Sequence, residues 1–127
     1  GKIFYCEGFV QTGRAYFRLV VKGQGGHGSS PHTSNDAIVA GAHFVTTAQT
    51  IVSRRLNPFE TGVVTIGSFD GKGQFNVIKD TITIEGDVRA LTDDTRDNIQ
   101  NEMTRLVRGL EEMFGVICDF EFKMSLL

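Results

Sequence analysis

The sequence predicts an α+β fold, a ferredoxin-like sandwich with two helices on one face of a four-stranded, mainly antiparallel sheet. Four segments alternate apolar and polar residues with the period of a half-buried strand, and two longer segments repeat apolar residues with the period of a helix. Their order is strand, helix, strand, strand, helix, strand (βαββαβ). With 127 residues, 40% of them apolar, the chain is long enough to bury one core.

The first half of the chain supplies one strand and one helix. Residues 15–22 are predicted to form the strand, and a helix capped by Asn35 or Asp36 is predicted to continue to about residue 55. Between residues 37 and 53 this helix carries no charge, whereas a surface helix normally has a charged outer face. We expect a partner or a second domain to cover it; the alternative is a weakly polar face in water. The residues expected to face the core are Ile38, Ala42, Val45 and Val52.

The second half supplies three strands and one helix. Strands are predicted at residues 63–69, 81–89 and 116–123. The helix is predicted to begin near Thr92, with acidic residues in its first turn, and to end at Gly115 in a left-handed conformation. Residues expected to face the core are Ile82, Ile84 and Val88, then Ile99, Met103, Leu106, Leu110 and Met113 on the helix, and Val116, Cys118, Phe120 and Phe122.

Charge and cysteine content narrow the partners and the compartment. A formal net charge of −2 argues against binding a nucleic-acid backbone. Cys6 and Cys118 are too few for a disulfide framework, which favours free thiols in the cytoplasm. No apolar run approaches the roughly 18 residues needed to span a bilayer, so we expect no membrane partner.

A glycine-rich loop, GQGGHGSSPH, follows the first strand and carries His27 and His32. Its glycines allow close approach to a ligand, and a histidine presented there suits hydrogen bonding to an oxyanion or proton transfer. The alternative is a flexible turn with two surface histidines. The loop also fits the G-x-G-x-x-G pattern, but no acidic residue follows between residues 37 and 59, as a dinucleotide site requires. No carboxylate or thiol accompanies the histidines at ligand spacing, so no metal site is expected in this chain.

Asn76 and Arg89 form a second candidate site. Asn76 precedes the strand predicted at residues 81–89, and Arg89 lies near the other end of that strand on its polar side. A guanidinium beside an amide donor suits a carboxylate, because the planar guanidinium binds both oxygens at once. The alternative is structural: Asn76 would cap a turn, and Arg89 would pair with Glu85 or Asp87 on the sheet surface.

Six motifs follow one another along the chain: GGHGSSPH at 25–32, NDAI at 35–38, QTIVSR at 49–54, VTIG at 64–67, NVI at 76–78 and GDVR at 86–89. The set resembles the lid, or dimerisation, domain of the dinuclear-zinc amidohydrolases and metallopeptidases. That family includes hippurate hydrolases, aminoacylases, indole-acetyl-amino-acid hydrolases, carboxypeptidase-like enzymes and succinyl-diaminopimelate desuccinylase. One departure is Lys79, where a proline often follows the N-V-I triplet.

The resemblance implies a role for each candidate residue. His27 would cross a dimer interface and stabilise the oxyanion that forms in the partner's active site when water attacks an amide carbonyl. Asn76 and Arg89 would bind the free carboxylate of the substrate. His32 matches the family's second loop histidine and is assigned to substrate binding. The two zinc ions would be held by a catalytic domain outside this sequence, with no metal ligand in this chain.

The expected function is that of a homodimeric lid domain in a zinc-dependent enzyme that cleaves the amide bond of N-acyl amino acids or small peptides. Residues 1–13 would connect it to its own catalytic domain, residues 14–124 would form the domain, and residues 125–127 would be a tail. Without the zinc ligands, the isolated chain is expected to be inactive. The alternative is a stand-alone regulatory module of ferredoxin-like fold that binds an amino acid.

Overall fold

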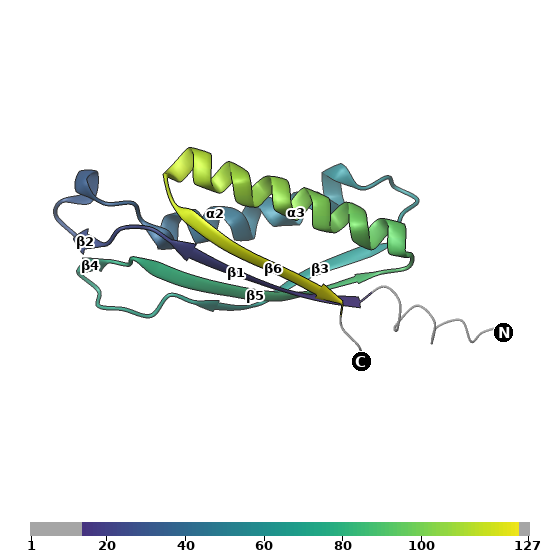
Figure 1. The fold of residues 1–127 in the computed structure, drawn as a ribbon, viewed down its shortest axis with the longest axis horizontal. Coiled ribbons are helices and arrows are strands. Elements are labelled where there is room, and N and C mark those ends of the chain that lie inside the picture. The colour runs from purple at the N-terminus through teal and green to yellow at the C-terminus, as the bar shows by residue number, and fades with distance from the viewer. Residues whose placement is uncertain (1–13, 125–127) are drawn as a thin grey trace.

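A computed structural model describes residues 14–124 of the chain. Two helices, α2 (Ala37–Thr50) and α3 (Asp93–Phe114), lie on one face of a four-stranded antiparallel sheet (Figure 1). The strand order in this sheet is β3-β5-β1-β6. The predicted α+β sandwich is therefore confirmed. Its strands are β1 (Arg14–Lys22), β3 (Gly62–Asp70), β5 (Thr81–Ala90) and β6 (Ile117–Met124).

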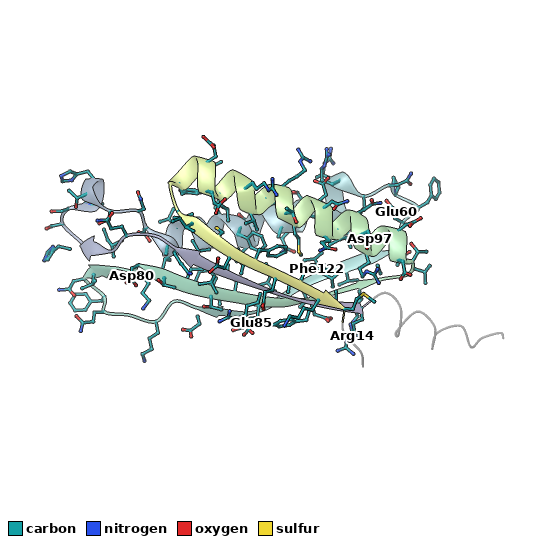
Figure 2. All side chains as sticks on the ribbon, viewed as in Figure 1. Arg14, Glu60, Asp80, Glu85, Asp97 and Phe122 are labelled. Atoms are coloured by element: carbon teal, nitrogen blue, oxygen red, sulfur yellow. The ribbon has the colours of Figure 1, made fainter. Side chains whose placement is uncertain are left out.

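A second, two-stranded sheet forms a tip at one end of the molecule, and the sequence did not predict it. It pairs β2 (Gly26–His27) with β4 (Val77–Ile78). The helical turn η1 (Pro31–Thr33) beside the tip was also not predicted. The first helix continues to residue 55 as predicted, but its last turn, η2 (Ile51–Arg55), is π-helical. The sheet has two distinct ends: Asp80 lies near the tip, and Arg14 begins β1 at the opposite end (Figure 2).

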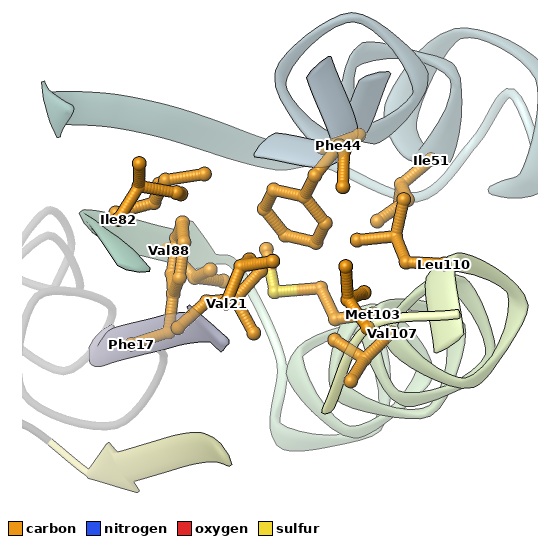
Figure 3. Packing of buried hydrophobic residues seen from close by; sticks show 14 of the residues in the cluster. Phe17, Val21, Phe44, Ile51, Ile82, Val88, Met103, Val107 and Leu110 are labelled. Carbon is orange, nitrogen blue, oxygen red and sulfur yellow. The ribbon is translucent and has the colours of Figure 1, made fainter. Parts of the chain in front are cut away.

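The hydrophobic core fills the space between the large sheet and the two helices (Figure 3). Phe17 of β1 and Phe44 of α2 are fully buried, and their rings meet edge to face with centroids 6.4 Å apart. The inward residues predicted for the strand at residues 81–89 are buried, and Phe120 and Phe122 of β6 pack against the core while staying partly exposed. The alternating strand pattern was therefore a sound guide to the buried face.

The predicted core face of the first helix was wrong except for Val45, which packs partly buried against the core, and Ala42 is exposed. Ile38 and Val52 are 40% and 37% exposed, and the buried positions of α2 are Ala37, Ala40, Gly41, Phe44 and Ala48. The small residues let the helix approach the sheet closely, since a Cβ on Gly41 would stand 2.6 Å from Ile82 Cδ1. A helix without charges is apolar on several faces, so periodicity alone could not select the right one.

The second helix was predicted more accurately. Ile99, Met103 and Leu110 are buried as expected, whereas Met113 is 62% exposed. Thr92 caps the helix by accepting a hydrogen bond from the Thr95 amide, and Gly115 ends it with φ of 69°. Because the outer face of α3 is charged, its sequence distinguishes the outer face from the buried one, which the sequence of α2 does not do.

Candidate functional site

The glycine loop is held tightly by the rest of the tip. The Gly28 amide donates to the carbonyl oxygen of Asn76 at 3.0 Å, and His27 pairs with Val77. A Cβ on Gly25 would stand 2.6 Å from the carbonyl oxygen of Ile78. Among residues 14–124 only Gly115 has a positive φ. The loop glycines therefore allow the close approach of two backbone segments, whereas the sequence had suggested close approach to a ligand.

The imidazole of His27 is exposed and is oriented from one side. Its Nδ1 atom lies 3.1 Å from the amide nitrogen of Ser29 and 2.7 Å from the hydroxyl oxygen of the same residue. Its Nε2 atom makes no hydrogen bond within residues 14–124. The ring is thus tethered at Nδ1, while Nε2 is available to a ligand.

Asn76 and His32 lie at the same tip as His27. Asn76 is exposed and immediately precedes β4, and only its backbone carbonyl is hydrogen-bonded within the described part of the chain. His32 is exposed in η1, which lies between β2 of the small sheet and α2 along the chain. The structure therefore brings His27, His32 and Asn76 together at one end of the molecule.

Arg89 lies at the other end of the sheet. Its Nε atom donates to Asp87 at 2.9 Å, and Arg14 reaches the other carboxylate oxygen of Asp87 at 3.5 Å. Arg14 and Arg89 stand directly opposite each other on β1 and β5, so Asp87 offsets the repulsion between two cations. The sequence had offered the pair with Asp87 as the structural alternative, and that contact is present. Nothing in the sequence pattern identified Arg14.

One copy of the chain does not place Arg89 near His27 and Asn76. Along β5, Arg89 lies eight residue steps from Thr81, which is at the tip end, and this corresponds to roughly 26 Å of extended strand. Figure 2 shows the two ends through Asp80 and Arg14, the cross-strand neighbour of Arg89. A single small ligand cannot contact both sites on the same copy.

An uncharged surface runs along α2 and the edge strand β3. The outward residues of α2 have no ionisable group apart from His43, whose ring packs against Phe114 of α3 at 5.4 Å. Beside them β3 is an edge of the sheet, and its Val63 is 54% exposed. A groove between the two elements is lined by Gln49, Val52, Ser53, Gly62, Val63 and Val64. An apolar edge strand beside an uncharged helix is a surface suited to association.

Residues 14–124 contain one cysteine, no cluster of metal ligands and no helix that could span a membrane. Cys118 is a free, half-buried thiol, and burial, with the nearby charges of Glu111 and Asp119, raises its pKa to about 11; Cys6 lies outside the described residues. In this range no three His, Cys, Asp or Glu side chains gather closely enough to hold a metal ion. The helices of the same range are too short or too polar to span a bilayer.

Sequence comparison identifies the family. The profile of the peptidase dimerisation domain matches residues 10–112 of this chain. This chain belongs to the peptidase dimerisation domain family. The predicted resemblance to an amidohydrolase and peptidase dimerisation domain is therefore confirmed.

The relatives of this dimerisation domain are hydrolases several times its length. An N-acetyldiaminopimelate deacetylase of Streptococcus sanguinis is 39% identical over 125 residues, which cover 98% of this chain and 33% of the relative. A Lactococcus lactis enzyme of the same name is 37% identical over 98% of this chain and 33% of its own. The chain therefore spans about a third of the length of these relatives.

Solved structures agree with this assignment. A chain described as an aminohydrolase from methicillin-resistant Staphylococcus aureus is 68% identical, with a TM-score of 0.88 over 92% of this chain and 31% of that one. Aminopeptidase PepT of Bacillus cereus shares the fold at 19% identity, with a TM-score of 0.71 over 88% of this chain and 29% of its own. The dimerisation domain fold is thus found both in a protein described as an aminohydrolase and in an aminopeptidase.

Proposed function

We propose that this chain is the dimerisation and substrate-binding lid domain of a zinc-dependent enzyme that hydrolyses the amide bond of N-acyl amino acids or small peptides. The observation that carries the proposal is the tip, where His27 is fixed through Nδ1 and keeps Nε2 open beside Asn76. Membership of the peptidase dimerisation domain family and the hydrolase names of the relatives support it.

We propose that residues 14–124 form the lid, that residues 1–13 connect it to a catalytic domain, and that residues 125–127 are a tail. Zinc, where bound by that catalytic domain, would supply Lewis-acid activation of water and carbonyl. The described residues of this chain offer no cluster that fits the metal, so no part of the proposed role of this domain runs through it. The free Cys118 favours a reducing cytoplasmic location.

Dimerisation is assigned to α2 and β3. This surface combines an uncharged helix face with an edge strand whose backbone groups are free to pair with a second copy. A two-fold arrangement would place the same elements of both copies against each other. Covering it would also account for the exposed Val52 and Val63.

Because the two candidate sites lie at opposite ends of the sheet, each active site of a dimer would use residues from both copies. Both β1 and β6 reach the Arg89 end of the sheet, because Ala15 pairs with Met124 there. A catalytic domain joined at that end would have Arg89 of its own copy nearby. His27 and Asn76 project from the opposite end, so they would serve the active site of the partner.

The chemistry of each group fits its place. When water attacks an amide carbonyl, negative charge develops on the oxygen, and the Nε2–H of His27 would donate a hydrogen bond to it. Arg89 would bind the substrate carboxylate through the guanidinium nitrogens that do not contact Asp87. Asn76 would add an amide donor to the carboxylate, and His32 would contact the substrate from the same tip.

Mixed dimers of the full-length enzyme test this arrangement. His27→Ala and Arg89→Ala each disable a homodimer, whereas a mixed dimer of the two retains one active site that has both His27 and Arg89. Random mixing should therefore restore roughly a quarter of wild-type activity, since half of the dimers are mixed and half of their sites are intact.

Mixing either variant with itself is the control, and chemical cross-linking or native mass spectrometry checks that subunits exchange. No recovery after verified exchange would contradict the division of His27 and Arg89 between copies. A His27→Ala homodimer with wild-type activity would contradict the catalytic role of the tip altogether.

A further inference from the structure

The two contacts at His27 carry information about its proton. A backbone amide can only donate a hydrogen bond, and the amide of Ser29 points at Nδ1 of His27 from 3.1 Å. The Nδ1 atom must therefore be the unprotonated, accepting nitrogen of the ring. In a neutral imidazole the other nitrogen then carries the hydrogen, so Nε2 is a donor.

The hydroxyl of Ser29 makes a second contact with the same ring nitrogen. Its oxygen lies 2.7 Å from the same Nδ1 atom, the shorter of the two contacts. Since the ring nitrogen is already an acceptor, the hydroxyl also donates to it. A tautomer with hydrogen on Nδ1 could still donate to the hydroxyl oxygen, but it would lose the amide contact and place two N–H groups against each other.

The loop holds Ser29 in position for this task. The Ser30 amide closes a turn by donating to the carbonyl oxygen of His27 at 2.9 Å, and the Gly28 amide donates to Asn76. The amide of Ser29 takes no part in this turn, and its hydrogen-bond partner among residues 14–124 is the imidazole itself. The neighbouring Ser30 makes no side-chain contact with the ring in the same range.

We propose that Ser29 is a positioning residue whose hydroxyl, together with its amide, holds His27 in the tautomer with hydrogen on Nε2. The inference deepens the proposed role of the tip and rests on it for its catalytic meaning. An oxyanion needs a donor that is already in place, and a free imidazole exchanges between two tautomers, of which only one offers Nε2–H.

Nitrogen NMR on the 127-residue chain tests the proposal without substrate or metal. Long-range proton–nitrogen correlation at about pH 8.5, well above the ordinary pKa of a histidine side chain, distinguishes the protonated from the unprotonated ring nitrogen. His27 should show a protonated Nε2 and an unprotonated Nδ1. His32, which makes no ring hydrogen bond within residues 14–124, is the internal reference for an exchanging imidazole.

Three variants sharpen the measurement. Ser29→Ala removes the hydroxyl but keeps the amide, so it should move both nitrogen shifts of His27 part of the way toward the averaged values of His32. Ser29→Thr should restore them, and Ser30→Ala should leave them unchanged. In the full-length enzyme Ser29→Ala should lower kcat roughly fivefold with little change in KM, the effect of one ordinary hydrogen bond.

Two results would overturn the role of Ser29. One is averaged nitrogen shifts for His27 in the wild-type chain, and the other is an unchanged spectrum in Ser29→Ala. Neither depends on catalysis, so the spectrum decides the tautomer while the kinetics of His27→Ala decide whether the tip acts on substrate. A fixed tautomer with no kinetic effect of His27→Ala would leave the Ser29 contact standing and remove the proposed function.

Discussion

The two ends of the sheet present their polar groups in different ways. At the β2–β4 end His27 is tethered through Nδ1, and its Nε2 atom has no hydrogen-bond partner within residues 14–124. At the opposite end Arg89 already donates to Asp87, a carboxylate that it shares with Arg14. The first end therefore presents a ring nitrogen without a hydrogen-bond partner in that range, and the second presents a cation already paired with a carboxylate.

Removing the donor of the tip should have the largest effect. In the full-length enzyme His27→Ala should lower kcat about 10²- to 10³-fold, because a pre-positioned hydrogen bond to an oxyanion is lost. Steady-state kinetics on N-acyl amino acids measure the change. The control is Arg108→Ala, at an exposed position of α3 outside the tip and outside the proposed α2–β3 interface, which should leave kcat near wild type. A fall in kcat of less than threefold for His27→Ala would remove the functional difference between the two ends.

Two glycine substitutions separate the sheet from its tip. A Cβ on Gly86, midway along β5, would overlap the ring of Phe17 and the carbonyl oxygen of Thr65. Gly86→Ala should therefore destabilise the whole domain by about 2 kcal/mol, as overpacking of a core does. A Cβ on Gly25 would meet the carbonyl oxygen of Ile78 and, less closely, Asp80, so Gly25→Ala should disturb the tip with a smaller loss of stability. Urea unfolding measures both variants, and equal losses would show that the tip and the sheet unfold as one unit.

As the pH falls, the structure near Arg89 should lose stability before the tip does. Hydrogen bonds from the Asn57 amide, the Thr95 hydroxyl and the Asn98 amide lower the pKa of Glu60, whose loop adjoins β3 at that end. A carboxyl whose pKa is lower in the folded than in the unfolded chain stabilises the folded state fully when the pH is above the unfolded-state pKa. This contribution is lost as the pH falls through the folded-state pKa. Below about pH 4 the amide of Asn57 should therefore lose protection against hydrogen exchange while that of Gly28 keeps it.

Two glutamine variants test this assignment to Glu60. Glu60→Gln should weaken the protection of Asn57 at neutral pH and flatten its dependence on acid. Glu112→Gln, at an exposed glutamate of α3 with no side-chain hydrogen bond in the described range, should behave as wild type. Acid loss of protection that is the same in Glu60→Gln as in wild type would show that other carboxyls are responsible.

The strands and the second helix could be predicted because their sequences contain strong contrast. Alternation identified the buried faces of β1, β5 and β6, and the acidic first turn and Gly115 marked the ends of α3. The buried face of α2 was mispredicted because a helix without charges gives periodicity nothing to contrast. Its correct face depends on Gly41 and the alanines fitting against Ile82, which is a matter of three-dimensional packing.

The candidate site was predicted in part. The histidines and Asn76 were found because a glycine-rich loop and a motif before a strand are visible in the sequence, and the structure places them on one tip. Ser29 and Arg14 were missed, because a serine in a loop and an arginine at the start of a strand are ordinary residues until their contacts are known. The sequence also paired Asn76 with Arg89, although β5 separates them by its length.

By itself, the sequence determined the fold class and the family and proposed candidate site residues, since local patterns and motifs carry that information. Only the tertiary structure decided which of those residues meet. The small β2–β4 sheet joins segments about fifty positions apart, and the direction of β5 sends Arg89 away from the tip. Contacts between distant segments depend on how strands pair and helices pack, which no local pattern records.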